Sequence, residues 1–267
     1  ADQLRVFFES GYFPGGVQVN VFGDNGQAFR QQELSGLLDE YGFYTTSLFS
    51  GALTIQVVIP LNSKDERSIS FTISKIIHVD ERYIEKETFR DCYIDANCPY
   101  ANEFTYINQL RRSTAFLYFP VGAGYAICTG GLLNDARTKD FQPYLLTANH
   151  CFDTQTSAAG LEAVSDHYSK ACNNDTANPS IVVVNGSNLI ATNPDTDFTL
   201  VLLRNLGGDT YLGWTTNNVG NGETMHAVHH PGGRLQKYSR FKNLYTPEYD
   251  CDNLPISRYF HTTTYAG

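Results

Sequence analysis

Residues 144–151, Tyr-Leu-Leu-Thr-Ala-Asn-His-Cys, carry the strongest structural signal in the chain. They begin as an apolar, β-prone run and end with a histidine where a strand would meet a loop. His150 would therefore be held at the edge of a packed core, directly before Cys151. An imidazole in such a position can take a proton from a nucleophile and return it to a leaving group near neutral pH. The alternative is a hydrogen-bonded histidine that only closes the end of a strand.

Two other stretches also join a short polar motif to an apolar run. Residues 126–134 read Ala-Ile-Cys-Thr-Gly-Gly-Leu-Leu-Asn, and residues 195–203 read Asp-Thr-Asp-Phe-Thr-Leu-Val-Leu-Leu. Asp197 directly precedes its apolar strand, whereas Asp195 lies further out in an Asn-Pro-Asp-Thr turn. We therefore predict that Asp197 is the carboxylate buried toward His150. A simple strand cap is the alternative for Asp197.

Together, the three stretches resemble the trypsin-like serine peptidases, and most closely their lysyl-endopeptidase-like bacterial branch. The resemblance covers roughly residues 92 to 267. It implies a pair of six-stranded antiparallel barrels, with the active site in the cleft between them. It also implies a secreted endopeptidase that needs no cofactor and acts on proteins or peptides. His150 would be its general base and Asp197 the acid that orients the base.

One feature departs from the family pattern, because no Gly-x-Ser-Gly occurs in the 267 residues. In the family, one more strand leads to Gly-Ser-Ser-Gly-Ser-Pro, which supplies the nucleophile and the oxyanion hole. Residues 261–267 resemble that last strand, so we expect a chain truncated before the serine, with an incomplete second barrel and no activity alone. The remaining carboxy-terminal part would then be a partner. Ser239 and Ser257 lie in no glycine-flanked turn.

A secreted binding module without catalysis is the competing functional class. The intact histidine and acid favour the truncated peptidase, since a protein that only binds has no need of them.

The composition fits a secreted, soluble protein. The chain is 42% hydrophobic and carries a formal net charge of −9, with a pI near 5.2. This charge disfavours a nucleic-acid partner, which needs a basic face. No apolar run approaches the ~18 residues of a membrane span. The chain begins with Ala-Asp-Gln rather than Met, which suggests a processed or excised piece.

The cysteines predict disulfides formed in an oxidising compartment. There are six, and the first 91 residues contain none. No Cys-x-x-Cys spacing indicates a zinc or redox site. The family resemblance implies bonds between Cys128 and Cys151 and between Cys98 and Cys172. A bond between the two remaining cysteines follows by remainder only; they are Cys92 and Cys251.

Residues 1–88 predict an antiparallel β-sandwich. Their apolar runs alternate with a period of two and are separated by turn residues; they are residues 4–8, 17–22, 53–59 and 69–77. Residues 79–91 are charged and suit a linker before a peptidase domain over 89–267. In the resembling family a β-rich pro-region precedes the mature enzyme, as in a zymogen. Lys86 and Arg90 would then be cleavage sites, although an ordinary linker explains these charges equally well.

From residue 92 onward, short strands predict a closed or nearly closed barrel. The expected strands are 115–119, 125–128, 144–147, 181–184, 198–203 and 225–229. Residues 153–179 hold few strand formers, so we expect a surface excursion tethered by Cys172.

Residues 226–231, His-Ala-Val-His-His-Pro, raise the question of a zinc site. On a strand, His226 and His229 would point to opposite faces, and no glutamate supplies the base of a metallohydrolase motif. A structural role for these histidines, or one lining the cleft, is therefore favoured, and no metal is predicted. Trp214 has a family counterpart near the base of the cleft, and we expect it to pack in the core.

Overall fold

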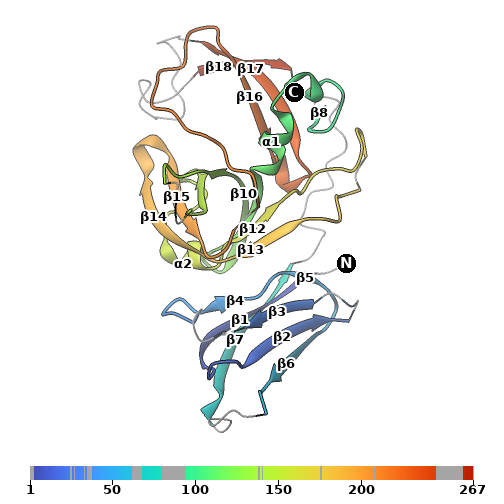
Figure 1. The fold of residues 1–267 in the computed structure, drawn as a ribbon, viewed down its shortest axis with the longest axis vertical. Helices are drawn as coiled ribbons and strands as arrows, with labels where there is room; N and C mark the ends of the chain where they lie inside the picture. The colour runs from blue at the N-terminus through green and yellow to red at the C-terminus, as the bar shows by residue number, and fades with distance from the viewer. Residues whose placement is uncertain are drawn as a thin grey trace. The chain divides into compact units, whose positions relative to one another are not determined.

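The computed structural model describes residues 3–24, 26, 28–32, 34, 38–61, 68–79, 94–137, 139, 141–174, 176–206, 208–244 and 261–266. The chain divides into two compact units, residues 1–86 and 87–267 (Figure 1). Most of the regular structure in the described residues is β-strand, as the sequence predicts. None of the described helices has the length and hydrophobicity needed to cross a membrane.

The described strands of the amino-terminal unit form two sheets that share one core. In the first sheet the order is β4-β1-β5, with β7 also paired to β1, and in the second it is β3-β2-β6. The bounds are β1 (Gln3–Tyr12), β2 (Gln18–Gly23), β3 (Ala28–Gln32), β4 (Phe43–Tyr44), β5 (Leu48–Phe49), β6 (Leu53–Val58) and β7 (Ser70–Val79). Val6 and Phe8 of the first sheet join Val19 and Val21 of the second in one buried cluster. Apolar side chains from both sheets therefore hold this unit together.

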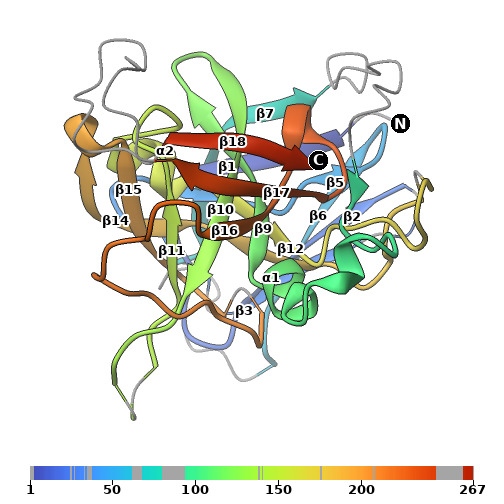
Figure 2. The same cartoon turned by 90° about the horizontal axis from the view of Figure 1, so that it is seen from above.

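Seven described strands of the carboxy-terminal unit form one strongly curled sheet (Figures 1 and 2). The order is β13-β12-β9-β10-β11-β15-β14. The bounds are β9 (Thr114–Val121), β10 (Gly124–Leu133), β11 (Tyr144–Thr147), β12 (Glu162–Ser165), β13 (Val182–Asn185), β14 (Ser187–Asn193) and β15 (Phe198–Leu203). Inside the curl lies a core of small and branched side chains that includes Ala115, Leu117, Leu132, Leu145 and Val201, each 0% exposed.

Gly186 marks the corner where the curled sheet returns on itself. β13 and β14 stand at opposite ends of the strand order, yet this one residue joins them in the chain. Gly186 has a φ of 77°, a left-handed conformation that glycine adopts without strain. A Cβ there would lie 2.9 Å from the Arg204 side chain. Glycine therefore meets both the conformational and the steric demand of this corner.

The expectation of a surface excursion over residues 153–179 is wrong in its first half. Residues 155–165 contribute α2 (Gln155–Ala159) and the strand β12, whose four residues are all buried. β12 pairs with β9 on one side and β13 on the other, so it lies within the sheet. Its Glu-Ala-Val-Ser sequence is too short and too polar to show a strand period.

Four described strands form the other sheet of the carboxy-terminal unit. The order is β16-β17-β18, with β8 also paired to β17. The bounds are β8 (Ile94–Asp95), β16 (Thr224–His229), β17 (Lys237–Leu244) and β18 (His261–Ala266). The helix α1 (Ile107–Arg112) contributes Ile107 to the buried cluster around Tyr238. Beside this cluster, Lys237 and Asp95 form an ion pair whose side chains are only 8% and 3% exposed.

Candidate active site

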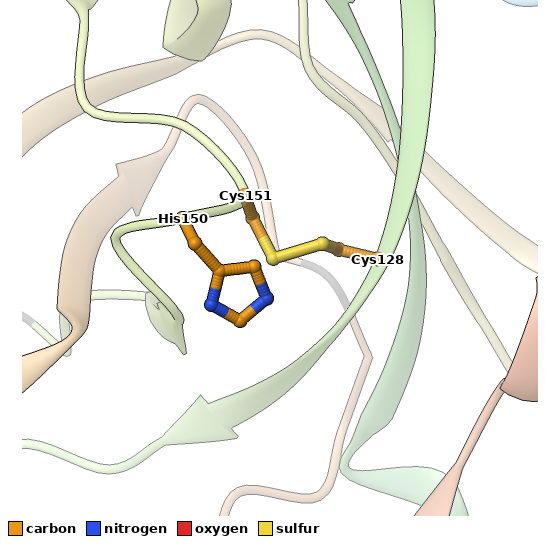
Figure 3. Close-up of side chains that lie close together, drawn as sticks. All are labelled: Cys128, His150 and Cys151. Atoms are coloured by element: carbon orange, nitrogen blue, oxygen red, sulfur yellow. A yellow bond between two sulfur atoms is a disulfide. The ribbon is translucent and has the colours of Figure 1, made fainter. Parts of the chain in front are cut away.

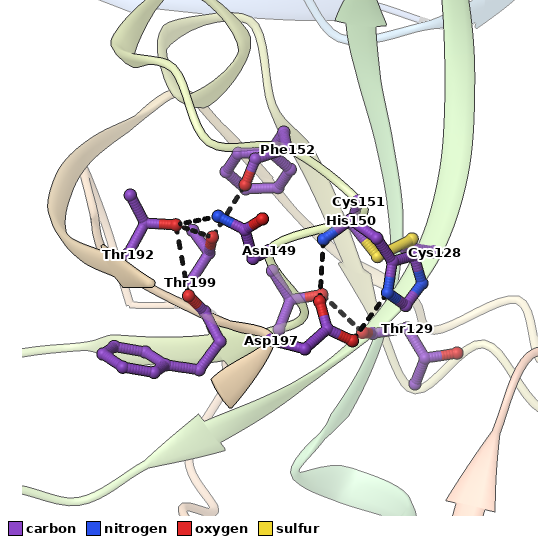
Figure 4. A network of polar contacts seen from close by, with 11 residues as sticks. Cys128, Thr129, Asn149, His150, Cys151, Phe152, Thr192, Asp197 and Thr199 are labelled. Atoms are coloured by element: carbon purple, nitrogen blue, oxygen red, sulfur yellow. Dashed lines mark hydrogen bonds and ion pairs between the residues drawn. A yellow bond between two sulfur atoms is a disulfide. The ribbon is translucent and has the colours of Figure 1, made fainter. Parts of the chain in front are cut away.

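His150 and Asp197 lie in direct contact, although they are 47 residues apart in the sequence (Figure 4). The Nδ1 atom of His150 is 2.7 Å from Oδ2 of Asp197, and the backbone N–H of His150 donates to Oδ1 at 2.9 Å. One carboxylate therefore holds both the ring and the backbone of the histidine. Because an ionised carboxylate can only accept a hydrogen bond, Nδ1 of the neutral ring carries the proton and donates it in this contact, which leaves the lone pair on Nε2. The His150 side chain is 73% exposed, and that of Asp197 is 23% exposed.

Strand pairing explains why these two residues meet. β11 pairs antiparallel with β15 from Tyr144↔Leu202 to Thr147↔Thr199. The loop that follows β11 therefore lies beside the residues that precede β15. Asp197 is the left-handed residue between the 3-10 helix η5 (Pro194–Thr196) and β15, with φ 48° and ψ 47°. Aspartate is one of the few residues other than glycine that tolerates this conformation.

A disulfide between Cys128 and Cys151 ties the histidine loop to β10, with 6.2 Å between the two Cα atoms (Figure 3). Together with His150, the two sulfurs form a group whose possible ligand atoms all lie within 4.8 Å of one another. Both sulfurs are bonded to each other, so neither is the thiolate that a metal ion would bind. The disulfide therefore restrains the loop that bears His150.

The second disulfide joins Cys98 to Cys172. It links the segment that follows β8 to the segment that follows β12. Cys92 and Cys251 lie outside the described residues, and a bond between them stays a prediction.

Asn149, Thr192 and Thr199 form a polar network next to His150 that the sequence analysis missed (Figure 4). The Asn149 side chain donates to Thr192 Oγ1 at 2.8 Å, and Thr192 Oγ1 lies 2.7 Å from Thr199 Oγ1. A polar residue directly before the histidine was the available signal. Its partners could be identified only once the register of β14 and β15 was known.

The three histidines of residues 226–231 have separate hydrogen-bond partners. His226 Nδ1 is 2.6 Å from the Tyr238 hydroxyl, and His229 Nε2 is 2.9 Å from Ser239 Oγ. His230 Nδ1 is 2.8 Å from the Arg234 carbonyl oxygen. Burial lowers the pKa of His230 to about 3, because its surroundings solvate the imidazolium poorly.

Trp214 does not pack in the core as expected, since it is 61% exposed. Its indole N–H donates to the Asn134 carbonyl at 3.2 Å. Leu212 is bridged to Leu133 of β10, but the residues after it leave the sheet, so the ring has little to pack against.

Neither alternative serine lies in a described turn. Ser239 is in the strand β17, opposite Ala227. Ser257 lies outside the described residues.

Comparison with known proteins identifies relatives for most of the chain. Residues 87–266 match a family model described as "Lysyl endopeptidase, C-terminal domain". The chain is 27% identical over 254 residues to a protein named lysyl endopeptidase from Pseudomonas aeruginosa. That alignment covers 89% of the chain and 54% of the relative, so the chain spans about half the length of the curated relative it matches.

Solved protease structures are also similar to the chain. The Rv3671c protease from M. tuberculosis, in its active form, has a TM-score of 0.41 and 9% identity, with 67% of the chain and 68% of that protein covered. The HtrA-type protease AlgW with a tripeptide has a TM-score of 0.39 and 15% identity, with 59% of the chain and 43% of that protein covered.

Proposed function

Because the chain belongs to the lysyl endopeptidase family, we propose that it is part of a secreted serine endopeptidase with a Ser-His-Asp triad. His150 is the general base and Asp197 is the acid that orients it. The observation that carries this proposal is the 2.7 Å contact between His150 Nδ1 and Asp197 Oδ2. The nucleophilic serine comes from a segment outside residues 1–267, which contain no Gly-x-Ser-Gly.

The geometry of the pair supports proton transfer in both steps of peptide hydrolysis. The serine hydroxyl attacks the peptide carbonyl carbon while its proton moves to Nε2 of His150. The Asp197 carboxylate stabilises the resulting imidazolium through Nδ1. The same proton then passes from Nε2 to the leaving amine, and water later cleaves the acyl-enzyme. With the side chain 73% exposed, the imidazole is open to a nucleophile and a substrate.

In this proposal residues 1–88 are a pro-region-like or accessory β-sandwich, and residues 89–267 are the peptidase domain. The curled sheet is the first barrel, and β8, β16, β17 and β18 begin the second. Two disulfides among the described residues support an oxidising, extracellular location. The substrates are proteins or peptides.

The missing Gly-x-Ser-Gly motif favours one competing function, a secreted module that binds without catalysis. A second competing function is peptide hydrolysis with Ser239 as the nucleophile, since its Oγ lies 2.9 Å from His229 Nε2. The carboxylate of Asp197 contacts His150, so the pair of Ser239 and His229 lacks that orienting acid.

Labelling with a fluorophosphonate probe separates these possibilities. We expect a protein extended past Gly267 to be labelled, His150→Ala to abolish the labelling, and Ser239→Ala to leave it unchanged. The 267-residue chain alone should not be labelled and should not hydrolyse lysyl, arginyl or aromatic peptides. A stop codon directly after Gly267 in the coding sequence, or an extended protein without labelling, would support the binding module.

A further inference from the structure

A chain of three hydrogen bonds starts on the residue before His150 and returns to the second residue after it (Figure 4). The Asn149 side-chain N–H donates to Thr192 Oγ1 at 2.8 Å. Thr199 Oγ1 donates to the Phe152 carbonyl at 2.7 Å. Because the single hydroxyl proton of Thr199 is used there, its oxygen is the acceptor in the 2.7 Å contact with Thr192. The Thr192 hydroxyl also lies 3.1 Å from the Phe198 carbonyl oxygen, and this oxygen competes with Thr199 for the one proton of that hydroxyl. The shorter contact, to Thr199, continues the series from Asn149 to Phe152.

Both ends of this series of hydrogen bonds lie in one loop, and its middle lies in one hairpin. Asn149 and Phe152 flank His150, while Thr192 in β14 and Thr199 in β15 flank Asp197. The hydrogen bonds therefore join the loop that bears the base to the hairpin that bears the acid. Their inner end is dry, since Thr199 is 0% exposed and Phe152 is 4% exposed. Water cannot readily replace a hydrogen bond in such surroundings.

We propose that Asn149, Thr192 and Thr199 form a positioning clamp that holds His150 Nδ1 within hydrogen-bond reach of Asp197. His150 needs such support because its 73% exposed side chain has few neighbours to restrain it. The disulfide at Cys151 restrains the loop toward β10 only. The clamp restrains it toward the hairpin. Its effect on turnover rests on the proposed function, but its effect on the contact between His150 and Asp197 does not.

Four variants separate the clamp from general packing. Asn149→Ala removes the first donor from a half-buried site, so it should fold. Thr192→Val keeps the shape of the side chain but removes its hydroxyl, and Thr192→Ser restores the hydroxyl. Thr196→Val is the matched control, because the Thr196 hydroxyl bonds to Asn193 at 3.2 Å, within the same hairpin.

The direct test is the exchange of the His150 Nδ1 proton with water, measured by NMR on the 267-residue chain. Loss of one hydrogen bond of ordinary strength should speed this exchange about five- to tenfold in Asn149→Ala and Thr192→Val. Thr192→Ser and Thr196→Val should stay within about twofold of the unmodified chain. Exchange at the unmodified rate in both Asn149→Ala and Thr192→Val would overturn the clamp.

The kinetic test uses the protein extended past Gly267. There, kcat should fall about five- to tenfold in Asn149→Ala and in Thr192→Val, while KM is unchanged. Thr192→Ser keeps the hydroxyl and should therefore keep the kcat of the unmodified protein. An equal loss of kcat in Thr196→Val would contradict a positioning role. If the extended protein hydrolyses nothing while the NMR effect is present, the proposed function fails and the clamp stands.

Discussion

At the scale of the residue, we expect the buried His230 to make the stability of the protein depend on pH. It is buried, with Nδ1 beside the Arg234 carbonyl and with the Phe116 and His167 rings 5.6 and 5.7 Å from its own. The pKa of His230 is lowered to about 3, mainly by burial and in small part by the neighbouring His167 and His229, while the hydrogen bond to the Arg234 carbonyl opposes the shift. Because this value lies below the ~6.5 of an unfolded histidine, only the unfolded chain takes up the proton as the pH falls.

The folded state therefore loses stability from about pH 6.5 downward. We expect His230 to contribute a fall in the free energy of unfolding of up to about 1.4 kcal/mol per pH unit between about pH 6.5 and 3. Urea unfolding of the carboxy-terminal unit at several pH values measures this fall. His230→Asn, whose amide can still donate to the Arg234 carbonyl, should reduce the slope. His78→Asn, at an exposed position, should leave it unchanged, and equal slopes in all three proteins would refute the assignment.

Asp197 should be as important to turnover as His150. In Asp197→Asn the amide group would face Nδ1 and force the imidazole proton onto Nε2, where it cannot accept from the serine. For the extended protein we expect kcat to fall by about four orders of magnitude with little change in folding. The control is Asp195→Asn, since that carboxylate is exposed and two residues away. Similar losses in both variants would show that charge, and not geometry, matters here.

The contact between His150 and Asp197 could be predicted from the sequence because His150 follows one apolar run, Asp197 precedes another, and both match a family motif. Thr192 and Thr199 gave no comparable signal, since threonines in strands are ordinary. Their contact depends on the register of β14 and β15, which shifts between Leu189 and Ala191. The prediction that Trp214 packs in the core was wrong, because the residue type does not indicate where the segment after Leu212 leaves the sheet.

At the scale of elements, β8 is two residues long and pairs with β17 beside a buried ion pair. Asp95 contacts Lys237 and also accepts the Asn173 backbone N–H at 2.7 Å. Lys237→Met would leave a buried carboxylate without its cation. We expect it to lower the free energy of unfolding by about 3 to 5 kcal/mol.

The double variant Asp95→Asn with Lys237→Met should recover much of that loss, because neither charge then remains buried. Arg112→Met is a suitable control, since its partner Asp209 is exposed, and it should change little. Denaturant titration of all three measures this. A small loss in Lys237→Met would show that water reaches Asp95.

Strands were predicted well where the sequence contains an apolar run. The runs at 115–119, 144–147 and 198–203 all lie within observed strands. β12 escaped detection because its burial comes from neighbours on both sides, β9 and β13, and not from its own pattern.

At the scale of the molecule, the two compact units differ in their covalent links. The first 91 residues contain no cysteine, whereas the described disulfides close 23- and 74-residue separations in the carboxy-terminal unit. Loop-closure entropy assigns these bonds about 3 and about 4 kcal/mol of stabilisation. We expect two unfolding transitions by calorimetry, of which a reducing agent lowers only one.

Tryptophan fluorescence identifies that transition, because Trp214 is the single tryptophan of the sequence. The reductant-sensitive transition should coincide with the change in its emission. A single transition, or one whose reductant sensitivity does not follow Trp214, would contradict independent units. The predicted boundary at residue 88 and the compact-unit boundary at residues 86 and 87 lie close together, although the role of each unit stays a prediction.

The order in which contacts can form during folding follows from the strand pairing described above. At Gly186 the curled sheet turns its corner within one residue, so that join needs almost no chain closure. The pairing of β11 with β15 instead joins residues 52 to 58 positions apart, from Thr147↔Thr199 to Tyr144↔Leu202. Closing a longer loop costs more entropy, so this pairing is the most expensive in the sheet. His150 and Asp197 therefore meet only after the longest-range pairing of the sheet has formed, and a partly folded chain that lacks this pairing carries His150 without its carboxylate partner.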